Sequence, residues 1–223
     1  MKVCIYLLRL KNHILNILFP IKCFNCKAIN EVFCPNCIFN TNKVQEFINE
    51  NMIAVFDYKD PVIKKAIWQL KYYHKTFLGK QLGRLLYEFL IEDISDIRLM
   101  SPGQKIFVIP IPISKRKRKK RGYNQSEIIA KGFCSCAPEN VFELRNDIVY
   151  KTIDNIPQAK ISDREKRLKN IKGVFEVRNS KIVKNKLIII IDDVITTGAT
   201  MNEIMKVLKR AGAKKVIGMA LAH

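Results

Sequence analysis

The sequence lacks a long uninterrupted apolar run in its first part. Isoleucine and leucine recur there at helical spacing, but Arg9, Lys11 and His13 interrupt them. A signal peptide or a membrane span requires a longer run of apolar residues without charges, so we expect neither. We expect instead a short amphipathic helix that ends at Pro20, and we place the protein in the cytoplasm.

Acidic residues are few beside basic ones. The chain has 20 Asp and Glu residues against 40 Lys and Arg residues, which gives a formal net charge of +20. Such an excess favours polyanionic partners, with nucleic acid as the leading candidate. A lysine-rich composition inherited from the genome would produce the same excess, so the charge supports DNA binding without establishing it.

With 223 residues, the chain is too short for two full domains. Hydrophobic residues make up 48% of the chain, and charged residues are distributed among them throughout. This composition is typical of a folded globular protein. We expect an N-terminal helix and a small cysteine-rich element over residues 1–45, followed by one α/β domain over residues 46–223.

Four cysteines form two Cys-x-x-Cys pairs that are seven residues apart. Two such turns can direct four thiolates at one centre, which is the closed tetrahedral arrangement of structural zinc sites. Disulfides are the alternative, but a reducing cytoplasm favours metal. The predicted zinc ligands are Cys23, Cys26, Cys34 and Cys37. We interpret the other three cysteines, Cys4, Cys134 and Cys136, as ordinary thiols.

The remainder of the chain alternates between strand-like and helix-like patterns. Strands are expected over residues 52–58, 105–109, 174–177, 187–191 and 216–221, with weaker ones over 141–144 and 148–150. Helices are expected over residues 61–71, 77–90, 122–133 and 202–210, and a polar loop over 153–170. Strands that alternate with helices indicate a mostly parallel sheet with both faces covered.

The segment that follows the apolar strand over residues 187–191 has the composition of a phosphate site. Two acids, Asp192 and Asp193, precede a threonine-rich turn at Gly198 that opens a helix. Amides at a helix N-terminus can hold a phosphate. The two carboxylates would repel that phosphate unless they bind ribose hydroxyls or a divalent cation. Alternatively, one acid caps the helix or pairs with a lysine.

Residues 188–200 resemble the phosphoribosyl pyrophosphate signature of type I phosphoribosyltransferases. The resemblance implies a type I phosphoribosyltransferase-like, Rossmann-like α/β domain with a parallel sheet, beside the small Cys4 zinc-ribbon-like element. It also implies that Asp192 and Asp193 hold the ribose 2- and 3-hydroxyls. The residues that would enclose the 5-phosphate are Thr196, Thr197, Gly198, Ala199 and Thr200.

Pyrophosphate with its Mg²⁺ needs donors opposite the threonine loop. Arg121 and Asn124, which precede a predicted helix, are the candidates, since Arg presents a planar fork to phosphate oxygens. Tyr123 between them could stack on a base or pack against the protein. A basic run just before them is predicted to follow a nucleic-acid backbone. The residues of that run are Lys115, Arg116, Lys117, Arg118, Lys119 and Lys120.

Nearly the whole chain resembles the ComF family, also called competence protein F or amidophosphoribosyltransferase-like proteins. Four features carry the resemblance: the apolar leader with Pro20 before the cysteine pairs, residues 58–72, residues 109–125 and the signature loop. Residues 157–175 resemble the family's mobile loop more loosely, with Lys151 and Asn155 where Arg and Thr are expected.

The ComF resemblance implies binding of single-stranded DNA during natural transformation, beside a helicase partner. The alternative is an active phosphoribosyltransferase that transfers the phosphoribosyl group to a nitrogen acceptor. A third possibility is that the site is a sensor or recognises a 5-phosphorylated strand end. We find no acceptor-recognition motif and assign no catalytic residue.

Overall fold

The computed structural model describes residues 20–152 and 173–223. The predicted amphipathic helix, Cys4 and the predicted loop over residues 153–170 lie outside these ranges. Within them, no helix combines the length and the apolar character that crossing a bilayer requires. Contacts divide the chain into a small unit, residues 1–41, and a large unit, residues 42–223. Residues 43–45, which we had expected in the small element, belong to the first strand of the large unit.

The small unit is built around its two cysteine turns. Lys22 and Ile29 form a β-bridge across the first turn, and Lys27 adopts a left-handed φ of 69° within it. The second turn leads into a short helix, α2 (Pro35–Phe39). The rings of Phe24 and Phe33 pack edge to face, with centroids 4.9 Å apart. Among residues 20–41, the buried apolar side chains are this pair and three cysteines, so we expect this part of the chain to depend on its cysteines.

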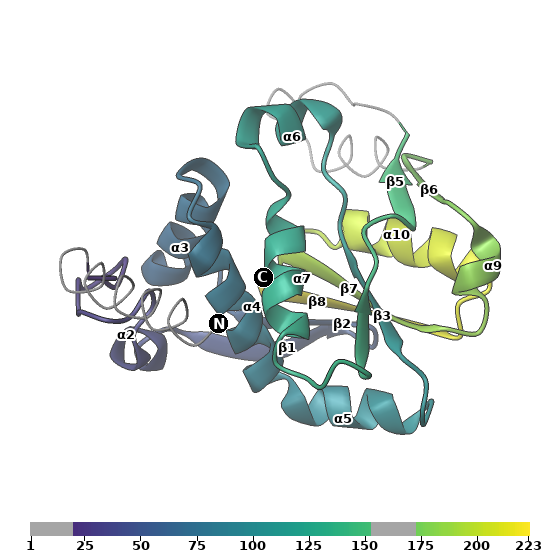
Figure 1. Ribbon diagram of the computed structural model, residues 1–223, viewed down its shortest axis with the longest axis horizontal. Coiled ribbons are helices and arrows are strands. Elements are labelled where there is room, and N and C mark those ends of the chain that lie inside the picture. Colours follow the sequence, from purple (N-terminus) through teal and green to yellow (C-terminus); the bar gives the residue numbers. More distant parts are fainter. Residues whose placement is uncertain (1–19, 153–172) are drawn as a thin grey trace, which may run out of the picture. The chain divides into compact units, whose positions relative to one another are not determined.

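The large unit contains a six-stranded sheet in the order β1-β2-β8-β7-β3-β4 (Figure 1). The strands are β1 (Lys43–Asn49), β2 (Met52–Phe56), β3 (Ile106–Pro110), β4 (Phe142–Leu144), β7 (Leu187–Val194) and β8 (Lys215–Ala222). Only β1, which no sequence pattern predicted, runs antiparallel to its neighbour. The expected mostly parallel sheet is therefore confirmed. Two expected strands form a separate antiparallel pair instead, β5 (Val149–Lys151) with β6 (Phe175–Val177).

Helices cover both faces of the sheet, as expected. They are α3 (Pro61–Tyr72), α4 (Thr76–Phe89), α5 (Ile91–Leu99), α6 (Lys115–Arg121), α7 (Gln125–Cys134), α9 (Ser180–Val183) and α10 (Ala199–Arg210). On one face, Ile204 and Leu208 of α10 pack with Ile188 and Ile190 of β7. The alternate residues of β7 point to the other face, where α7 contacts β3 and β7 and α4 contacts β8.

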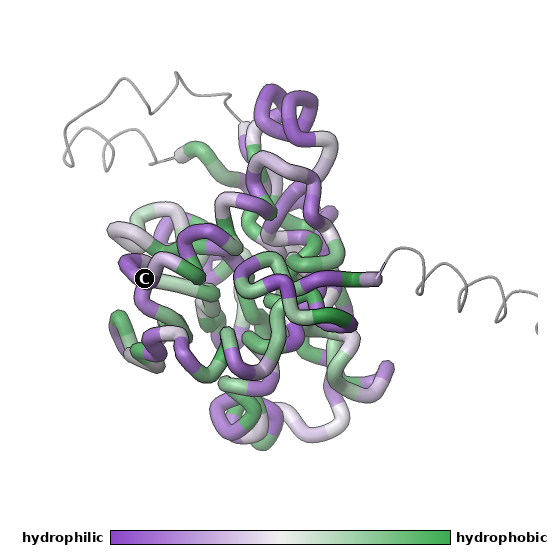
Figure 2. The backbone as a smooth tube through the Cα atoms, turned by 90° about the vertical axis from the view of Figure 1, so that its left-hand side faces the viewer, coloured by the Kyte–Doolittle hydropathy of each residue, from purple (hydrophilic) through white to green (hydrophobic). Residues whose placement is uncertain are grey.

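Helix α6, between β3 and α7, is formed by the basic run, for which no helix was predicted. Its seven residues are all Lys or Arg, which are good helix formers. The Ser114 hydroxyl accepts a hydrogen bond from the Lys117 amide and so caps the first turn. Gly122, at φ 76°, ends the helix in the left-handed conformation. The helix is the strongly hydrophilic segment at the top of Figure 2.

Helices α4 and α7 cross in close contact through two glycines. A Cβ atom added at Gly83 would lie 2.0 Å from the carbonyl oxygen of Ile129, and one added at Gly132 would lie 2.0 Å from the carbonyl oxygen of Lys80. No side chain fits at either position, so the backbones touch directly. This contact fixes the position of α7, whose first residues, Gln125 and Ser126, line the candidate site.

Candidate functional site: a polar cavity beside two aspartates

A cavity of 360 Å³ opens at the carboxyl ends of β3 and β7. Parallel α/β sheets commonly bind their ligands at this edge. From β7 and the turn after it come Asp192, Asp193, Thr196 and Thr200. Residues of three further regions complete the wall, among them Tyr58, Lys71, Tyr72, Ser114, Lys117, Arg121, Gln125, Ser126 and Lys151.

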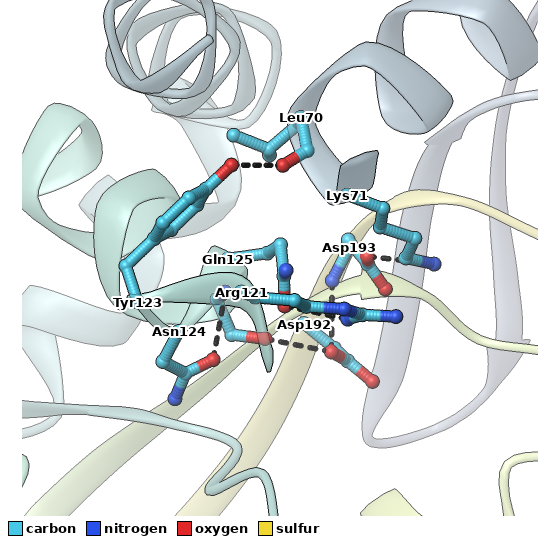
Figure 3. A network of polar contacts seen from close by, with 9 residues as sticks. Leu70, Lys71, Arg121, Tyr123, Asn124, Gln125, Asp192 and Asp193 are labelled. Carbon is cyan, nitrogen blue, oxygen red and sulfur yellow. Dashed lines mark hydrogen bonds and ion pairs between the residues drawn. The ribbon is translucent and has the colours of Figure 1, made fainter. Parts of the chain in front are cut away.

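Asp192 is held in place by two donors (Figure 3). The Ser126 hydroxyl and the Asp193 amide both donate to its Oδ1, each at 2.9 Å. Burial, together with the neighbouring carboxylate of Asp193, raises the pKa of Asp192 to about 7. The two donors fix the orientation of the Asp192 carboxylate, which lines the cavity.

Asp193 forms an ion pair with Lys71 at the C-terminal end of α3. Lys71 Nζ lies 2.8 Å from Asp193 Oδ2, and the side chains are 23% and 10% exposed. Burial opposes the charged form of Lys71, but Asp193 outweighs this effect and raises the pKa of the ammonium group. A lysine partner for one of the two acids was the alternative left open by the sequence. Lys71 itself was not predicted as a site residue, although it lies in one of the segments that resemble the ComF family.

The threonine loop turns sharply between β7 and α10. Gly198 adopts a left-handed φ of 69° directly before the helix. The Thr197 hydroxyl accepts a hydrogen bond from the Ala199 amide at 3.4 Å. Thr196 and Thr200 line the cavity, whereas Thr197, Gly198 and Ala199 form the turn that places them there.

A basic wall lines the cavity beside the aspartates. Its cations are Lys71, Lys117, Arg121 and Lys151, against the two carboxylates of Asp192 and Asp193. Lys117 is largely exposed on α6, yet partial burial of its ammonium group lowers its pKa, as do the like charges of Arg121, Lys151 and Lys71. Like charges held this close favour a bound anion that neutralises them.

Arg121 and Gln125 share one hydrogen bond in this wall. Arg121 Nη1 donates to Gln125 Oε1 at 2.9 Å, and the guanidinium lies 5.5 Å from the centroid of the Tyr72 ring. Gln125 is 2% exposed, and its Nε2 finds no hydrogen-bond partner among residues 20–152 and 173–223. A buried amide donor without a partner is costly, so a ligand oxygen would stabilise it.

The structure corrects the prediction for Asn124. Its side chain is 5% exposed and does not line the cavity. Its Nδ2 donates to the carbonyl of Ile111 at 2.9 Å, and its Oδ1 accepts from the Ser126 amide at 3.2 Å. Asn124 therefore caps α7 and fixes the end of β3, because both of its polar atoms are already used.

The remaining predicted residues lie around the mouth of the site. Lys115, Arg116, Arg118, Lys119 and Lys120 are exposed on α6 and lie outside the cavity, unlike Lys117. Tyr123 is used in packing, because its hydroxyl donates to the Leu70 carbonyl (Figure 3). Of the two roles left open for Tyr123, the structure favours packing over base stacking.

In the small unit, the four predicted cysteines converge. Their Sγ atoms all lie within 4.8 Å of one another, with Cys23 and Cys37 at 3.9 Å and Cys26 and Cys34 at 3.4 Å. None forms a disulfide. Four thiolates around a tetrahedral zinc ion would be separated by about 3.8 Å, so the cluster fits a metal ion.

The Cys23 thiol is the more easily ionised for its surroundings. Burial disfavours its thiolate form, but hydrogen bonds from the backbone at Cys34, Cys26 and Asn25 outweigh the effect of burial and lower the pKa of Cys23 to about 6.

Known proteins resemble this chain in sequence. The family described as "Phosphoribosyl transferase domain" matches residues 120–223. "Competence protein F" of Haemophilus influenzae is 28% identical over 191 residues, which cover 85% of this chain and 78% of that protein. "DNA utilization protein YhgH" of Escherichia coli (strain K12) is 28% identical over 170 residues, covering 75% and 69%. "Competence protein ComFC" of Bacillus subtilis is 24% identical over 208 residues, covering 85% and 78%. In these sequence matches, as in its parallel sheet and cavity, the chain is similar to the phosphoribosyltransferase-like proteins of the ComF family.

Proposed function

We propose that the pocket binds phosphoribosyl pyrophosphate and that the protein also binds single-stranded DNA during DNA uptake. The observation that supports binding of phosphoribosyl pyrophosphate is the position of the two acids. Asp192 and Asp193 stand at the carboxyl end of β7, between the threonine turn and the basic wall. A ligand with a sugar between two phosphate groups has the matching order of anion, hydroxyl and anion.

Each part of the ligand has a counterpart in this arrangement. The carboxylates of Asp192 and Asp193 accept hydrogen bonds from the ribose hydroxyls. Amides at the start of α10, with the hydroxyls of Thr196 and Thr200, bind the 5-phosphate. Lys71, Lys117 and Arg121 bind the pyrophosphate, and the unpartnered amide of Gln125 donates to one of its oxygens. Mg²⁺ would accompany the pyrophosphate and neutralise part of its charge.

Single-stranded DNA is proposed on other grounds. Relatives of the chain are named for competence and for DNA utilization. The net charge of +20 and the fully basic helix α6 provide cations for a phosphate backbone. We propose that the protein acts in natural transformation beside a helicase, in the cytoplasm, where the cysteine cluster stays reduced and holds structural Zn²⁺.

An active phosphoribosyltransferase is the second candidate. It is supported by the carboxylate pair and the threonine loop, which lie together at one cavity. In that reaction, a nitrogen nucleophile attacks the anomeric carbon of the sugar as its bond to pyrophosphate breaks. The protein would contribute by holding the sugar and by stabilising the charge of the departing pyrophosphate.

Calorimetric titration tests the proposal. Phosphoribosyl pyrophosphate with Mg²⁺ is titrated into the wild type and into the Asp192→Asn/Asp193→Asn variant, and a single-stranded oligonucleotide is titrated at several salt concentrations. We expect the variant to lose sugar-phosphate binding but to keep salt-sensitive oligonucleotide binding. Binding of neither ligand to the wild type would refute the proposal. Release of pyrophosphate with a panel of nitrogen acceptors would establish the second candidate.

A further inference from the structure

Three aromatic side chains are exposed together at the end of α3. Trp68, Tyr72 and Tyr73 are 54%, 50% and 56% exposed. The Trp68 ring contacts both tyrosines, with centroids 5.4 Å and 5.5 Å away. Trp68 is the only tryptophan of the chain. Soluble proteins rarely expose contiguous groups of large apolar side chains without a binding function.

This aromatic cluster, defined as Trp68, Tyr72 and Tyr73, lies beside cations. The guanidinium of Arg121, the last residue of α6, is 5.5 Å from the centroid of the Tyr72 ring. Through that contact the cluster adjoins α6, in which every residue is basic and none is buried. Tyr72 also lines the cavity, so the cluster stands at its mouth.

Acidic residues are missing from both segments that form this surface. Residues 61–87 and residues 115–126 contain no Asp or Glu. An acidic partner therefore meets no carboxylate from either segment, and flat exposed rings beside cations suit a chain that carries both bases and phosphates. A protein partner with only an apolar face would make no use of Arg121 and the other basic side chains of α6.

The aromatic cluster is held against the pocket by three successive residues. Leu70 accepts a hydrogen bond from Tyr123, Lys71 pairs with Asp193, and Tyr72 lies under Arg121. The end of α3 is thereby fixed to α6, to Tyr123 in the turn between α6 and α7, and to β7. A surface fixed in this way needs little ordering when a ligand binds.

We propose that the aromatic cluster stacks on the bases of single-stranded nucleic acid whose phosphates lie along α6. The inference rests on the proposed DNA-binding function and locates it on the molecule. Bases of any sequence can stack on aromatic rings, and Arg and Lys beside the rings bind the backbone. The strand would then run past the mouth of the sugar-phosphate pocket, between the aromatic cluster and α6.

Trp68 provides a direct test. Its fluorescence is recorded while an oligothymidylate is titrated into the full chain, and affinity is measured separately by anisotropy of a labelled oligonucleotide. We expect stacking to quench the fluorescence over the concentration range in which the oligonucleotide binds. We expect Trp68→Ala/Tyr73→Ala to weaken binding about tenfold or more, because each lost stack removes a substantial part of the affinity.

Two further variants separate stacking from loss of the fold. Trp68→Phe keeps an aromatic ring and should retain an affinity within about threefold of the wild type. Leu99→Ala removes a side chain that is 77% exposed on α5 and should change nothing. Sugar-phosphate binding should be the same in all three variants.

Oligonucleotide binding without quenching, and with unchanged affinity in the double variant, would overturn this inference and leave the proposed function standing. Failure of the wild type to bind any oligonucleotide would overturn this inference together with the DNA-binding part of the proposed function.

Discussion

Lys71 Nζ lies 2.8 Å from Asp193 Oδ2 and so joins the end of α3 to the carboxyl end of β7. The pair places a cation from the first half of the chain beside the acids of the phosphoribosyltransferase signature. The region that matches the phosphoribosyl transferase domain begins only at residue 120. The pocket therefore requires residues from well outside that region.

Lys71→Ala should weaken binding of phosphoribosyl pyrophosphate by about tenfold or more, because a charge-assisted contact to the ligand is lost and Asp193 is left without its cation. Calorimetry with Mg²⁺ present measures the change. Lys64→Ala, which removes an exposed lysine from the same helix, is the matched control and should bind normally. Equal affinities for the two variants would show that Lys71 serves only the fold.

Stability should depend on pH through Asp192. Burial, with Asp193, raises its pKa to about 7 in the folded protein, whereas the pKa is about 3.9 in an unfolded chain. The folded state therefore holds the proton more tightly, and the stability contributed by this group is lost as pH rises from about 4 to about 7. Asp192→Asn removes the penalty.

We expect Asp192→Asn to increase the free energy of unfolding by about 2 kcal/mol at pH 8 and to change it little near pH 4. The full pKa shift would give about 4 kcal/mol, but water in the pocket reduces it. Urea unfolding at both pH values provides the measurement. A gain of the same size at both values would contradict the assigned pKa.

Gly83→Ala should destabilise the large unit by about 3 kcal/mol, because the new methyl group would meet the backbone oxygen of Ile129. Gly79→Ala on the same helix is the matched control. There the new Cβ would lie 2.7 Å from Leu70 Cδ1 and 2.8 Å from Ile128 Cγ2, which are side-chain methyl groups and not backbone atoms. Both variants gain the same helix propensity, so thermal unfolding isolates the backbone contact. Equal losses would show that the two helices can separate.

Metal analysis tests the cysteine cluster. We expect about one zinc ion per purified chain and its loss in Cys26→Ser, whereas Cys136→Ser should keep it. Hydrogen exchange should become fast over residues 20–41 in the metal-free protein, because the metal supplies the folding free energy of this unit, while residues 42–223 keep their protection. Normal protection over residues 20–41 after metal removal would contradict this account.

The features that could be predicted from the sequence are local ones. The apolar strand, the acids and the threonine turn follow one another along the chain, and so do the paired cysteines. The pattern of residues 187–200 thus predicts where Asp192, Asp193, Thr196 and Thr200 lie. The strand order and the second sheet of β5 and β6 could not be predicted, because strand pairing depends on contacts between distant segments.

Several residues that line the site come from segments far from residues 187–200 in the sequence. They could not be predicted, because their position also depends on contacts between distant segments. Lys71, Ser126 and Lys151 lie in or beside segments that resemble the ComF family, but no local pattern singles out these three side chains as parts of the cavity wall. Asn124 was misassigned, although its place just before a helix, with Ser126 two residues later, is typical of a helix cap. Residues 115–121 are uniformly basic and have no apolar periodicity. A helix in this stretch therefore cannot be predicted from the spacing of hydrophobic residues.

The position of β8 has a consequence for how the protein is made. The strand comes last along the sheet-forming part of the chain, yet it lies between β2 and β7. While residues 215–222 are still inside the ribosome, β2 and β7 have no strand to join them, and their apolar edges stay open to chaperones or to aggregation. Residues 20–41 need no later segment for their cysteine cluster. All four cysteines of the cluster are therefore available to a metal ion while the large unit is still being synthesised.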